Sequence, residues 1–306
     1  MREDNGPQNP APARRGPPLL RPRLAVAVSH LFFEPSALGR EALAAGDGLE
    51  LKGVPAPSWI SKRRVKVFHS GLGLAEEEFR ASFTQIGRFL ASGDVELFSC
   101  DLGPSARRRL GLVPLSPVLT KEEIFERSEK AVDLVRQFYQ GPIAAENYNF
   151  YPTGLYEHVC RPDFIAEYLE KLDLSLTLDL AHAAITAYNF GQSLESYLHE
   201  LPLHRVAEIH ISRPYLPEGP PALAADAHYG VGPKELGWLN DFLDRLERVD
   251  PAKRSDGLSS SARPGGVLAL RLRPWVVVEN YASIQSVLRA NAKVALLLAK
   301  RLSPDH

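Results

Sequence analysis

Short apolar runs typical of β-strands alternate with amphipathic segments of helical spacing along most of the 306 residues. The apolar runs lie at 24–28, 49–51, 65–68, 95–98, 142–145, 176–179, 206–210 and 275–278. The segments with helical spacing lie at 35–45, 76–90, 120–139, 161–171, 234–246 and 283–300. Strands that alternate with helices pair in parallel, and about eight such units close into a barrel. The alternation therefore predicts an α/β protein with a (β/α)8 TIM barrel.

The same alternation also fits a doubly wound open sheet, which is the alternative fold. The sequence lacks the Gly-rich dinucleotide fingerprint that often accompanies such a sheet, so we favour the barrel. The length of 306 residues and the hydrophobic content of 44% allow one large core. We expect a single barrel domain over 23–303, preceded by a disordered Pro/Arg-rich tail at 1–22. The Gly, Ser and Pro content of 254–266 predicts a mobile loop within it.

The net charge restricts the classes of binding partner, and the cysteine content restricts the cellular compartment. The formal net charge is −1, which provides no whole-molecule field favouring nucleic acid or an anionic membrane. Cys100 and Cys160 are the only cysteines, which excludes a disulfide framework and suits a reducing compartment. No apolar run is long enough to cross a bilayer, and the N-terminal stretch lacks the apolar core of a secretory signal. We expect a cytoplasmic protein without a membrane partner.

The stretch from Leu174 to Arg213 contains two short apolar strands that end in metal-binding groups. The first ends at Asp179, with His182 one helical turn later, and the second ends at His210. An apolar strand that ends in a carboxylate or an imidazole is costly to bury unless that group has a partner. Hard and borderline cations are such partners. The stretch therefore predicts half of a metal site.

Groups of the same kind follow most of the other predicted strands. They are His69, Asp101, Glu146 and Glu279, with Asp226 and His228 on the loop after the seventh strand. Because barrel active sites lie at the carboxyl ends of the strands, we expect these side chains to meet at one face. Taken singly, each has a structural explanation, such as a helix N-cap for Asp179 or an ion pair with Arg for Glu146. Clustered without cations, they would shift each other's pKa values strongly, so the set predicts a multinuclear metal site.

Several neighbouring residues are predicted to support this site. Glu208 lies two residues before His210, so both side chains point the same way on a regular strand, and we expect Glu208 to orient the imidazole. His30 is either a site-lining residue or a hydrogen-bonding partner, and Cys100 is expected to be a buried, inert thiol. The residues predicted to hydrogen-bond the substrate or the ligands are Asn147, Asn189 and Asn280. We assign no catalytic acid or base beyond the metal ligands.

Five motifs resemble those of the multinuclear non-haem iron-dependent oxidases, a family that was formerly a domain of unknown function and includes the methanobactin-biosynthesis enzyme MbnB. The motifs are Glu146-Asn147, Leu178-Asp179-Leu180-Ala181-His182-Ala183 with Thr186-Ala187 and Asn189, Leu201-Pro202-Leu203 with Arg205-Val206, Glu208-Ile209-His210-Ile211-Ser212, and Asp226-Ala227-His228. The resemblance runs from about His69 to Glu279. It is strongest between Glu146 and His228, where the order and spacing of the motifs are specific.

The resemblance implies a xylose-isomerase-like barrel that holds two or three iron ions and uses O2 to oxidise a cysteine of a peptide substrate. Such chemistry belongs to peptide natural-product (RiPP) biosynthesis, and a partner protein for substrate presentation would fit it. The iron ligands implied by position are His69, Glu146, Asp179, His210, Asp226, His228 and Glu279. His182 falls where many members have Asn and some have His, so it is implied as a further ligand.

One departure from the family bears on the metals. Ser99-Cys100-Asp101-Leu102 stands where the family typically reads Ser-Glu-His-Leu, so Asp101 replaces an expected His ligand. A carboxylate can bind iron, but it favours higher oxidation states than an imidazole does. The replacement leaves the number of metals and the outcome of the reaction open.

Other barrels use almost the same groups. Endonuclease IV-like phosphodiesterases combine Glu, Asp-x-x-His, His, Asp-x-His and Glu around three zinc ions, but they use a His where Asp101 stands, and the net charge does not favour DNA. A sugar isomerase or epimerase needs a single metal, held by Glu146, Asp179, His210 and Glu279. A non-catalytic peptide-binding barrel would need none of these ligands. Metal analysis separates these functions.

Overall fold

The computed structural model describes residues 21–28, 36–53, 58–61, 64–92, 94–219, 222–249, 273–280 and 283–301. Three sequence predictions lie wholly or almost wholly outside these ranges. They are the tail at 1–22, of which only the last two residues are described, the loop at 254–266, and His30.

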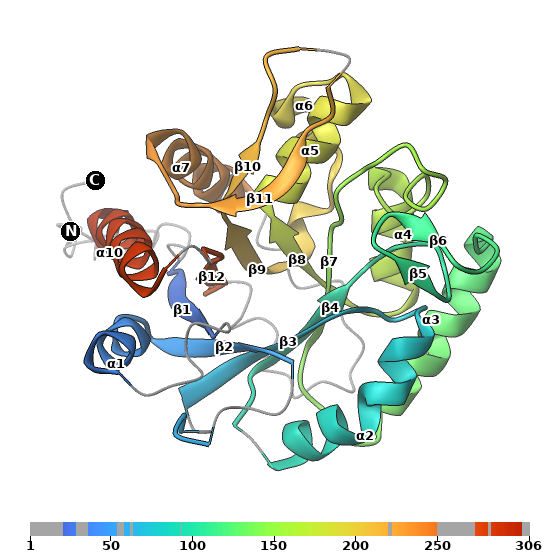
Figure 1. Cartoon of the computed structure of the whole chain (residues 1–306), viewed down its shortest axis with the longest axis horizontal. Coiled ribbons are helices and arrows are strands. Elements are labelled where there is room, and N and C mark those ends of the chain that lie inside the picture. The colour runs from blue at the N-terminus through green and yellow to red at the C-terminus, as the bar shows by residue number, and fades with distance from the viewer. Residues whose placement is uncertain are drawn as a thin grey trace, which may run out of the picture.

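The described residues form a closed barrel of eight parallel strands, seen from one end in Figure 1. The strands are β1 (Arg23–Val28), β2 (Gly48–Lys52), β3 (Val65–Gly73), β4 (Leu97–Asp101), β7 (Ile143–Glu146), β8 (Ser175–Asp179), β9 (Val206–Ile211) and β12 (Trp275–Val278). The barrel closes because β1 pairs in parallel with both the second and the last strand, with Val26 opposite Leu49 on one side and Val278 on the other. The prediction of a (β/α)8 barrel is confirmed.

Helices cover the outside of the barrel (Figure 1). They are α1 (Ala37–Ala44), α2 (Glu77–Ser92), α3 (Lys121–Arg136), α4 (Pro162–Lys171), α5 (Leu180–Phe190), α6 (Leu194–Glu200), α7 (Pro233–Arg248) and α10 (Ile284–Arg301), with a 3-10 turn at Leu203–Arg205. Within the described part of the chain, no helix separates β2 from β3, so the alternation is less regular than predicted. None of the described helices has the length and apolarity needed to span a membrane.

Most elements lie within a few residues of their predicted positions, and β3 is the main exception. The apolar run predicts a strand over 65–68, but the strand continues to Gly73. It does so because it keeps pairing with β4 through a register shift between His69 and Gly73, which places Gly73 opposite Asp101. Backbone pairing with a neighbouring strand therefore extends β3 beyond its apolar residues.

The barrel interior explains how the strands deliver polar groups to one end. A small buried cluster of Ala25, Ala27, Val67, Leu97, Ala144, Ala207, Trp275 and Val277 is separate from the large core shared with the helices. Because strand side chains alternate between the two faces, the inward positions repeat every second residue. Val67, Ala144 and Val277 each lie two residues before a predicted ligand. The ligands therefore continue the inward rows at the carboxyl ends of the strands.

Two local features concern the start of α3 and the cysteines. Thr120 caps α3 through a capping box, in which Thr120 Oγ1 accepts from the backbone N–H of Glu123 at 3.2 Å and the Glu123 carboxylate accepts from that of Thr120 at 2.9 Å. Cys100 and Cys160 are buried and free. The capping box satisfies two backbone N–H groups at the start of α3. The predicted burial of Cys100 is confirmed.

Candidate metal centre

The side chains predicted as ligands lie together at the carboxyl end of the barrel. The predicted ligands are His69, Asp101, Glu146, Asp179, His182, His210, Asp226, His228 and Glu279. A continuous series of contacts between imidazole nitrogens and carboxylate oxygens, none longer than 3.4 Å, joins most of them. Asp179 joins through two groups of three residues whose ligand atoms lie within 4.8 Å of one another.

Glu146 lies at the middle of this network and is buried. Its Oε2 atom is 3.2 Å from Nε2 of His69, and its Oε1 atom is 3.3 Å from Nδ1 of both His182 and His210. Burial pushes the pKa of Glu146 upward, but the imidazoles of His210 and His69 outweigh burial and hold the pKa well below its ordinary value. The two oxygens of Glu146 therefore face different imidazoles.

Glu279, which directly follows β12, connects the other side of the site. Its Oε1 atom is 3.1 Å from Nδ1 of His210, and its Oε2 atom is 3.3 Å from Nδ1 of His228. His228 Nε2 lies 2.9 Å from Oδ2 of Asp226, which in turn lies 3.4 Å from Nε2 of His182. Starting from Glu146, the contacts therefore return to Glu146 and close a ring.

Asp179 serves as a helix cap and faces the site at the same time. Its Oδ1 atom accepts from the backbone N–H of His182 at 2.7 Å, which caps α5, while its Oδ2 atom has no hydrogen-bond partner within the described structure. Asn147 fixes the backbone of Asp179 in both directions, at 2.8 Å and 3.1 Å. Nδ1 of His182 lies 2.9 Å from the backbone oxygen of Asn147, which leaves Nε2 facing Asp226. The cap and the predicted ligand role are therefore compatible.

A β-ribbon carries Asp226 and His228 to the mouth of the barrel. The loop predicted after the seventh strand contains β10 (Arg213–Tyr215) and β11 (Ala225–Tyr229), which pair antiparallel. Asp226 and His228 lie two residues apart on β11 and contact each other. Asn189 ties this ribbon to α5, because its Oδ1 atom accepts from the backbone N–H of Ala224 at 2.9 Å. His228 has a φ of 44°, in the left-handed region that non-glycine residues rarely adopt.

Glu208 contacts the ring nitrogen of His210 that faces away from the other ligands. Its Oε1 atom lies 3.2 Å from Nε2 of His210, and its Oε2 atom accepts from Thr177 Oγ1 at 2.8 Å. Nδ1 of His210 is left to face Glu146 and Glu279. A carboxylate on the second nitrogen orients an imidazole and raises its basicity as a ligand.

The amides of the three predicted asparagines contact the protein itself. Asn147 positions Asp179, and Asn189 positions the ribbon, as described above. Asn280 is buried, and its Nδ2 atom donates to Ser286 Oγ at 2.7 Å. The contacts of Asn147 and Asn189 support the site, and that of Asn280 joins the end of β12 to α10. Their predicted contacts with a substrate remain a prediction.

Sequence reasoning missed Glu50 and Lys52 on β2. Glu50 is fully buried, and neither of its oxygens makes a hydrogen bond within the described residues. It lies 3.7 Å from Nε2 of His210 and forms a potential metal-binding group with His69 and His210. Lys52 pairs with Glu279 and lies 3.9 Å from Glu50. The sequence pattern could have predicted Glu50. On a short strand, an acid between two apolar residues faces the opposite side of the sheet from those residues, which here is the barrel interior.

The composition of the site fits more than one cation. Among the described residues, seven carboxylates here face four imidazoles and one ammonium group. The carboxylates are Glu50, Asp101, Glu146, Asp179, Glu208, Asp226 and Glu279, the imidazoles are those of His69, His182, His210 and His228, and the ammonium is that of Lys52. Burial lowers the pKa values of His182 and His210, but the surrounding carboxylates outweigh burial and raise both pKa values well above the ordinary value. Without metal, protons balance the excess negative charge, and cations would balance it with better geometry.

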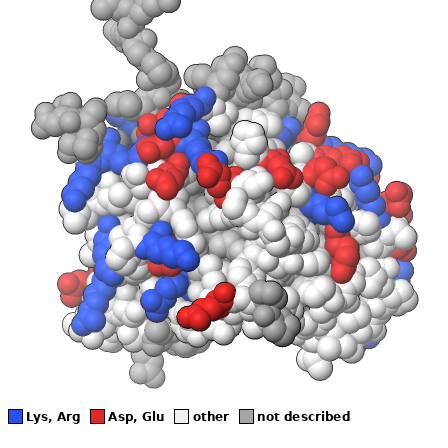
Figure 2. Space-filling model, turned by 90° about the horizontal axis from the view of Figure 1, so that it is seen from above, with Lys and Arg blue, Asp and Glu red and all other residues white. Residues whose placement is uncertain are grey.

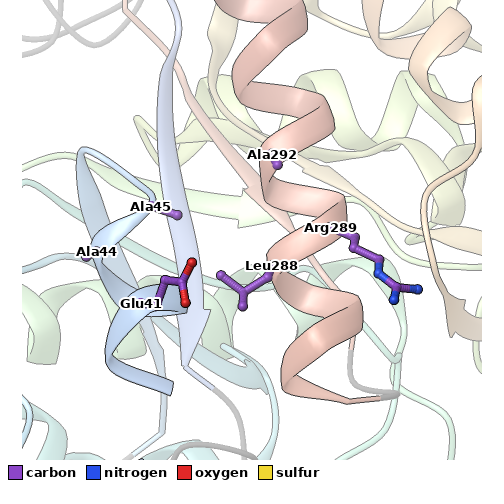
Figure 3. Close-up of a pocket in the computed structure, with 6 residues that line it drawn as sticks. All are labelled: Glu41, Ala44, Ala45, Leu288, Arg289 and Ala292. Atoms are coloured by element: carbon purple, nitrogen blue, oxygen red, sulfur yellow. The ribbon is translucent and has the colours of Figure 1, made fainter. Parts of the chain in front are cut away.

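A hollow lies outside the barrel, between α1 and α10 (Figure 3). Its volume is about 550 Å³, and its lining includes Ala44, Ala45, Leu288 and Ala292. Glu41 is its only acidic group among the described lining residues. Glu41 and Arg289 are the only charged groups among its described lining residues, and the other four are apolar. This lining offers little for catalysis, so the candidate site is the cluster at the barrel mouth.

Comparison with known proteins identifies the family. Residues 61–235, which are more than half of the chain, match the family model of the RiPP precursor modification enzymes MbnB, TglH and ChrH. The chain belongs to this family. The match runs from just before β3 into α7 and so includes every predicted ligand except Glu279. The family suggested by the motifs is confirmed.

Individual relatives agree with this assignment. A UPF0276 protein of Shewanella loihica is 27% identical over 154 residues, which cover 49% of this chain and 55% of the relative. A UPF0276 protein of Pseudomonas aeruginosa is 29% identical over 126 residues, covering 40% and 43%. The chain therefore matches about half the length of these curated relatives.

Solved structures support the fold. A D-tagatose 3-epimerase-like protein superposes with a TM-score of 0.56 at 14% identity, over 91% of this chain and 98% of that chain. A xylose isomerase-like TIM barrel protein from Mycobacterium smegmatis, in complex with magnesium, gives a TM-score of 0.56 at 12% identity, over 92% and 98%. Identities this low show the fold alone. The predicted xylose-isomerase-like barrel is confirmed.

Proposed function

We propose that this chain is an iron-dependent oxidase that uses O2 to modify a cysteine of a RiPP precursor peptide. The observation that carries the proposal is the bridging geometry of Glu146, whose two oxygens lie within 3.3 Å of three imidazoles. A carboxylate in this position would be able to bridge two cations, which a site for one metal does not require. The family match supplies the peptide substrate class.

Within this continuous network we infer three groups of proposed ligands. His69, Asp101 and Glu146 form one group, and Asp179, His210 and Glu279 form a second. A third consists of His182, Asp226 and His228, joined by contacts of 2.9 and 3.4 Å to Oδ2 of Asp226. We infer that these groups hold two or three iron ions, which when bound supply the electron transfer and the activation of O2.

The exposure of the side chains indicates where a peptide would approach. His69, Glu146, His210 and Glu279 are almost fully buried, whereas the side chains of Asp226 and His228 are 20% and 27% exposed. The site therefore opens beside β11. The protein positions the ligands and excludes water from the inner part of the site, and the ribbon forms the wall that a substrate meets first. A partner protein that presents the peptide would dock near this ribbon.

Metal analysis tests the proposal. The chain is purified anaerobically from iron-supplemented cells and examined by elemental analysis and Mössbauer spectroscopy, with His210→Ala as the control. We expect two or three irons per wild-type chain, little iron in the variant, and an O2-dependent mass change of a cysteine-containing peptide. Three zinc ions would instead support the phosphodiesterase, and a single manganese the sugar isomerase. A chain that takes up no metal would refute the proposal.

A further inference from the structure

A small basic pocket lies beside the proposed metal centre. It has a volume of about 270 Å³, and its lining includes Arg213, Gly230, Asn280, Arg289 and Lys293. None of the described residues that line it is acidic. We call it the basic pocket.

The basic pocket adjoins the metal centre through the chain itself. Asn280 directly follows Glu279, and Gly230 lies two residues after His228. Consecutive Cα atoms are about 3.8 Å apart, so the backbone of both lining residues lies within about 8 Å of a proposed ligand. A short peptide segment can therefore contact the metal centre and the basic pocket at the same time.

Three cationic side chains from two elements meet at the basic pocket. Arg213 lies on β10, and Arg289 and Lys293 lie four residues apart on the same face of α10. In Figure 3, Arg289 extends from α10 away from α1 and Leu288. Arg289 lines both the hollow of Figure 3 and the basic pocket.

Two of these cations are held in place by contacts that leave donors available. Lys293 Nζ donates to the backbone oxygen of Val231 at 3.1 Å, which uses one of its three N–H groups. The guanidinium group of Arg213 lies over the ring of Tyr229 at 5.4 Å. The N-terminus of α7 adds little positive charge, because the Glu235 carboxylate already accepts from the backbone N–H of Gly232 at 2.8 Å. The positive charge comes from the side chains.

We propose that the basic pocket binds a carboxylate of the peptide substrate while the cysteine of that peptide is at the metal centre. This inference rests on the proposed function. Guanidinium and ammonium groups pair well with carboxylates, and the carboxylate-rich metal centre next to the pocket would repel a free anion unless the anion were tethered to a bound group. A carboxylate on the bound peptide meets that condition. The basic pocket would then select peptides that carry an acidic group near the modified cysteine.

Calorimetry with the full-length, iron-loaded chain under anaerobic conditions tests the pocket. The probes are Gly-Gly-Cys with a free C-terminal carboxylate, Gly-Gly-Cys amide, and Asp-Gly-Cys amide. We expect at least one of the two carboxylate-bearing probes to bind about tenfold more tightly than Gly-Gly-Cys amide, as several partly exposed ion pairs would give. Preference for the first identifies a C-terminal carboxylate, and preference for the third identifies a side-chain carboxylate.

Variants test whether the basic pocket causes the preference for carboxylate-bearing probes. Arg289→Gln combined with Lys293→Gln is expected to abolish it, whereas Lys300→Gln, an exposed lysine on the same helix outside the basic pocket, is expected to keep it. Equal affinity of the wild-type chain for all three probes, or a preference that survives the double substitution, would overturn the inference. Iron content measured in the same samples separates the two hypotheses. A chain without iron contradicts the proposed function, while a probe preference abolished by the double substitution still supports the basic pocket.

Discussion

Some residues at the barrel mouth make a structural contact and also have a proposed role in metal binding. Asp179 caps α5 with one oxygen and leaves the other facing the site. Glu208 receives a hydrogen bond from Thr177 while it contacts His210. A structural explanation for one of these residues therefore does not exclude a ligand role for it, and substitutions can separate the two.

Substitutions of Asp179 separate the cap from the metal. Both Asp179→Asn and Asp179→Ala are expected to bind metal far more weakly than the wild-type chain. The Asn variant keeps an oxygen that can cap α5, so the metal-free Ala variant should be about 1 kcal/mol less stable than the metal-free Asn variant. Chemical denaturation and elemental analysis measure the two effects. Retention of stoichiometric iron in both variants would contradict the ligand assignment.

Replacement of Asp101 by His restores the residue that the family typically has. Asp101 Oδ1 lies 3.2 Å from Nε2 of His69, so this side chain faces the site. Because a neutral imidazole stabilises ferric iron less than a carboxylate does, Asp101→His is expected to raise the reduction potential of the iron. A redox titration followed by Mössbauer spectroscopy measures the shift. An unchanged or lower potential would argue that Asp101 does not bind iron, and Asp94→His, a change outside the site, serves as the control.

Removal of the charge of Glu208 tests its orienting role. Glu208→Gln is expected to weaken metal binding about 10- to 100-fold, the usual cost of losing a partner that orients a ligating His. The fold should remain, because Gln can still accept from Thr177. Competition with a chelator of known affinity measures the change. A complete loss of metal would instead indicate that Glu208 is itself a ligand.

At the scale of the element, the ends of helices and strands carry the information that positions the site. Several strands begin with apolar inward residues and end at acids or imidazoles, so that they fill the barrel at one end and offer candidate ligands at the other. The β10–β11 ribbon completes the mouth, and its antiparallel pairing brings Asp226 and His228 over the site. Helices such as α3 stabilise this arrangement from outside without contributing ligands.

The capping box of α3 provides a test of stability that leaves the site unchanged. Thr120→Ala is expected to lower the free energy of unfolding by about 1 kcal/mol, because the backbone N–H of Glu123 loses its acceptor. Metal content should not change. Thermal and chemical denaturation measure the loss, with the exposed loop substitution Thr153→Ala as the control. An equal loss of stability in both variants would show that the cap contributes nothing specific.

At the scale of the whole molecule, the charge of the site contrasts with that of the surface. The formal net charge is only −1, and Figure 2 shows basic and acidic side chains next to one another along the upper part and the left side of the face that it displays. The excess of carboxylates is concentrated inside the barrel mouth. Stability of the metal-free chain should therefore depend on the protonation of this cluster.

The stability of the metal-free chain is expected to fall as the pH rises above about 6.5. Raised pKa values of His182 and His210 mean that these imidazoles stabilise the fold when protonated, and this stabilisation is lost as the pH rises through the raised pKa values. The lowered pKa values of Glu146 and Asp226 have the opposite effect at acid pH. These carboxylates stabilise the fold when ionised, so stability also falls as the pH drops below the ordinary carboxylate range, about 4.

Bound metal should counteract the loss of stability that is expected at alkaline pH. Imidazoles bind metal without their protons, so the increase in Tm on iron loading is expected to grow from pH 6 to pH 8.5. Melting curves of chelator-treated and iron-loaded protein across this range measure both effects. A chelator-treated chain that gains stability with rising pH would contradict the proposed protonation of His182 and His210.

The sequence by itself determined the alternation of strands and helices and the chemical groups that stand at the ends of the strands. The alternation of strands and helices required parallel pairing, and strands that end in Asp179 or His210 could only be buried with a partner for those groups. Such local patterns are visible because the period of a strand and the cost of burying a charge do not depend on distant contacts.

Only the tertiary structure decided which groups face one another. Glu50 stands between two leucines in mid-strand, and it became a neighbour of His69 and His210 only when the barrel closed. Asp226 and His228 meet His182 and Glu279 because a ribbon folds back over the mouth. The position of Glu146 between three imidazoles and the basic pocket beside Glu279 likewise arise from segments far apart in the chain. Distances between such segments follow from packing and closure, which no local pattern specifies.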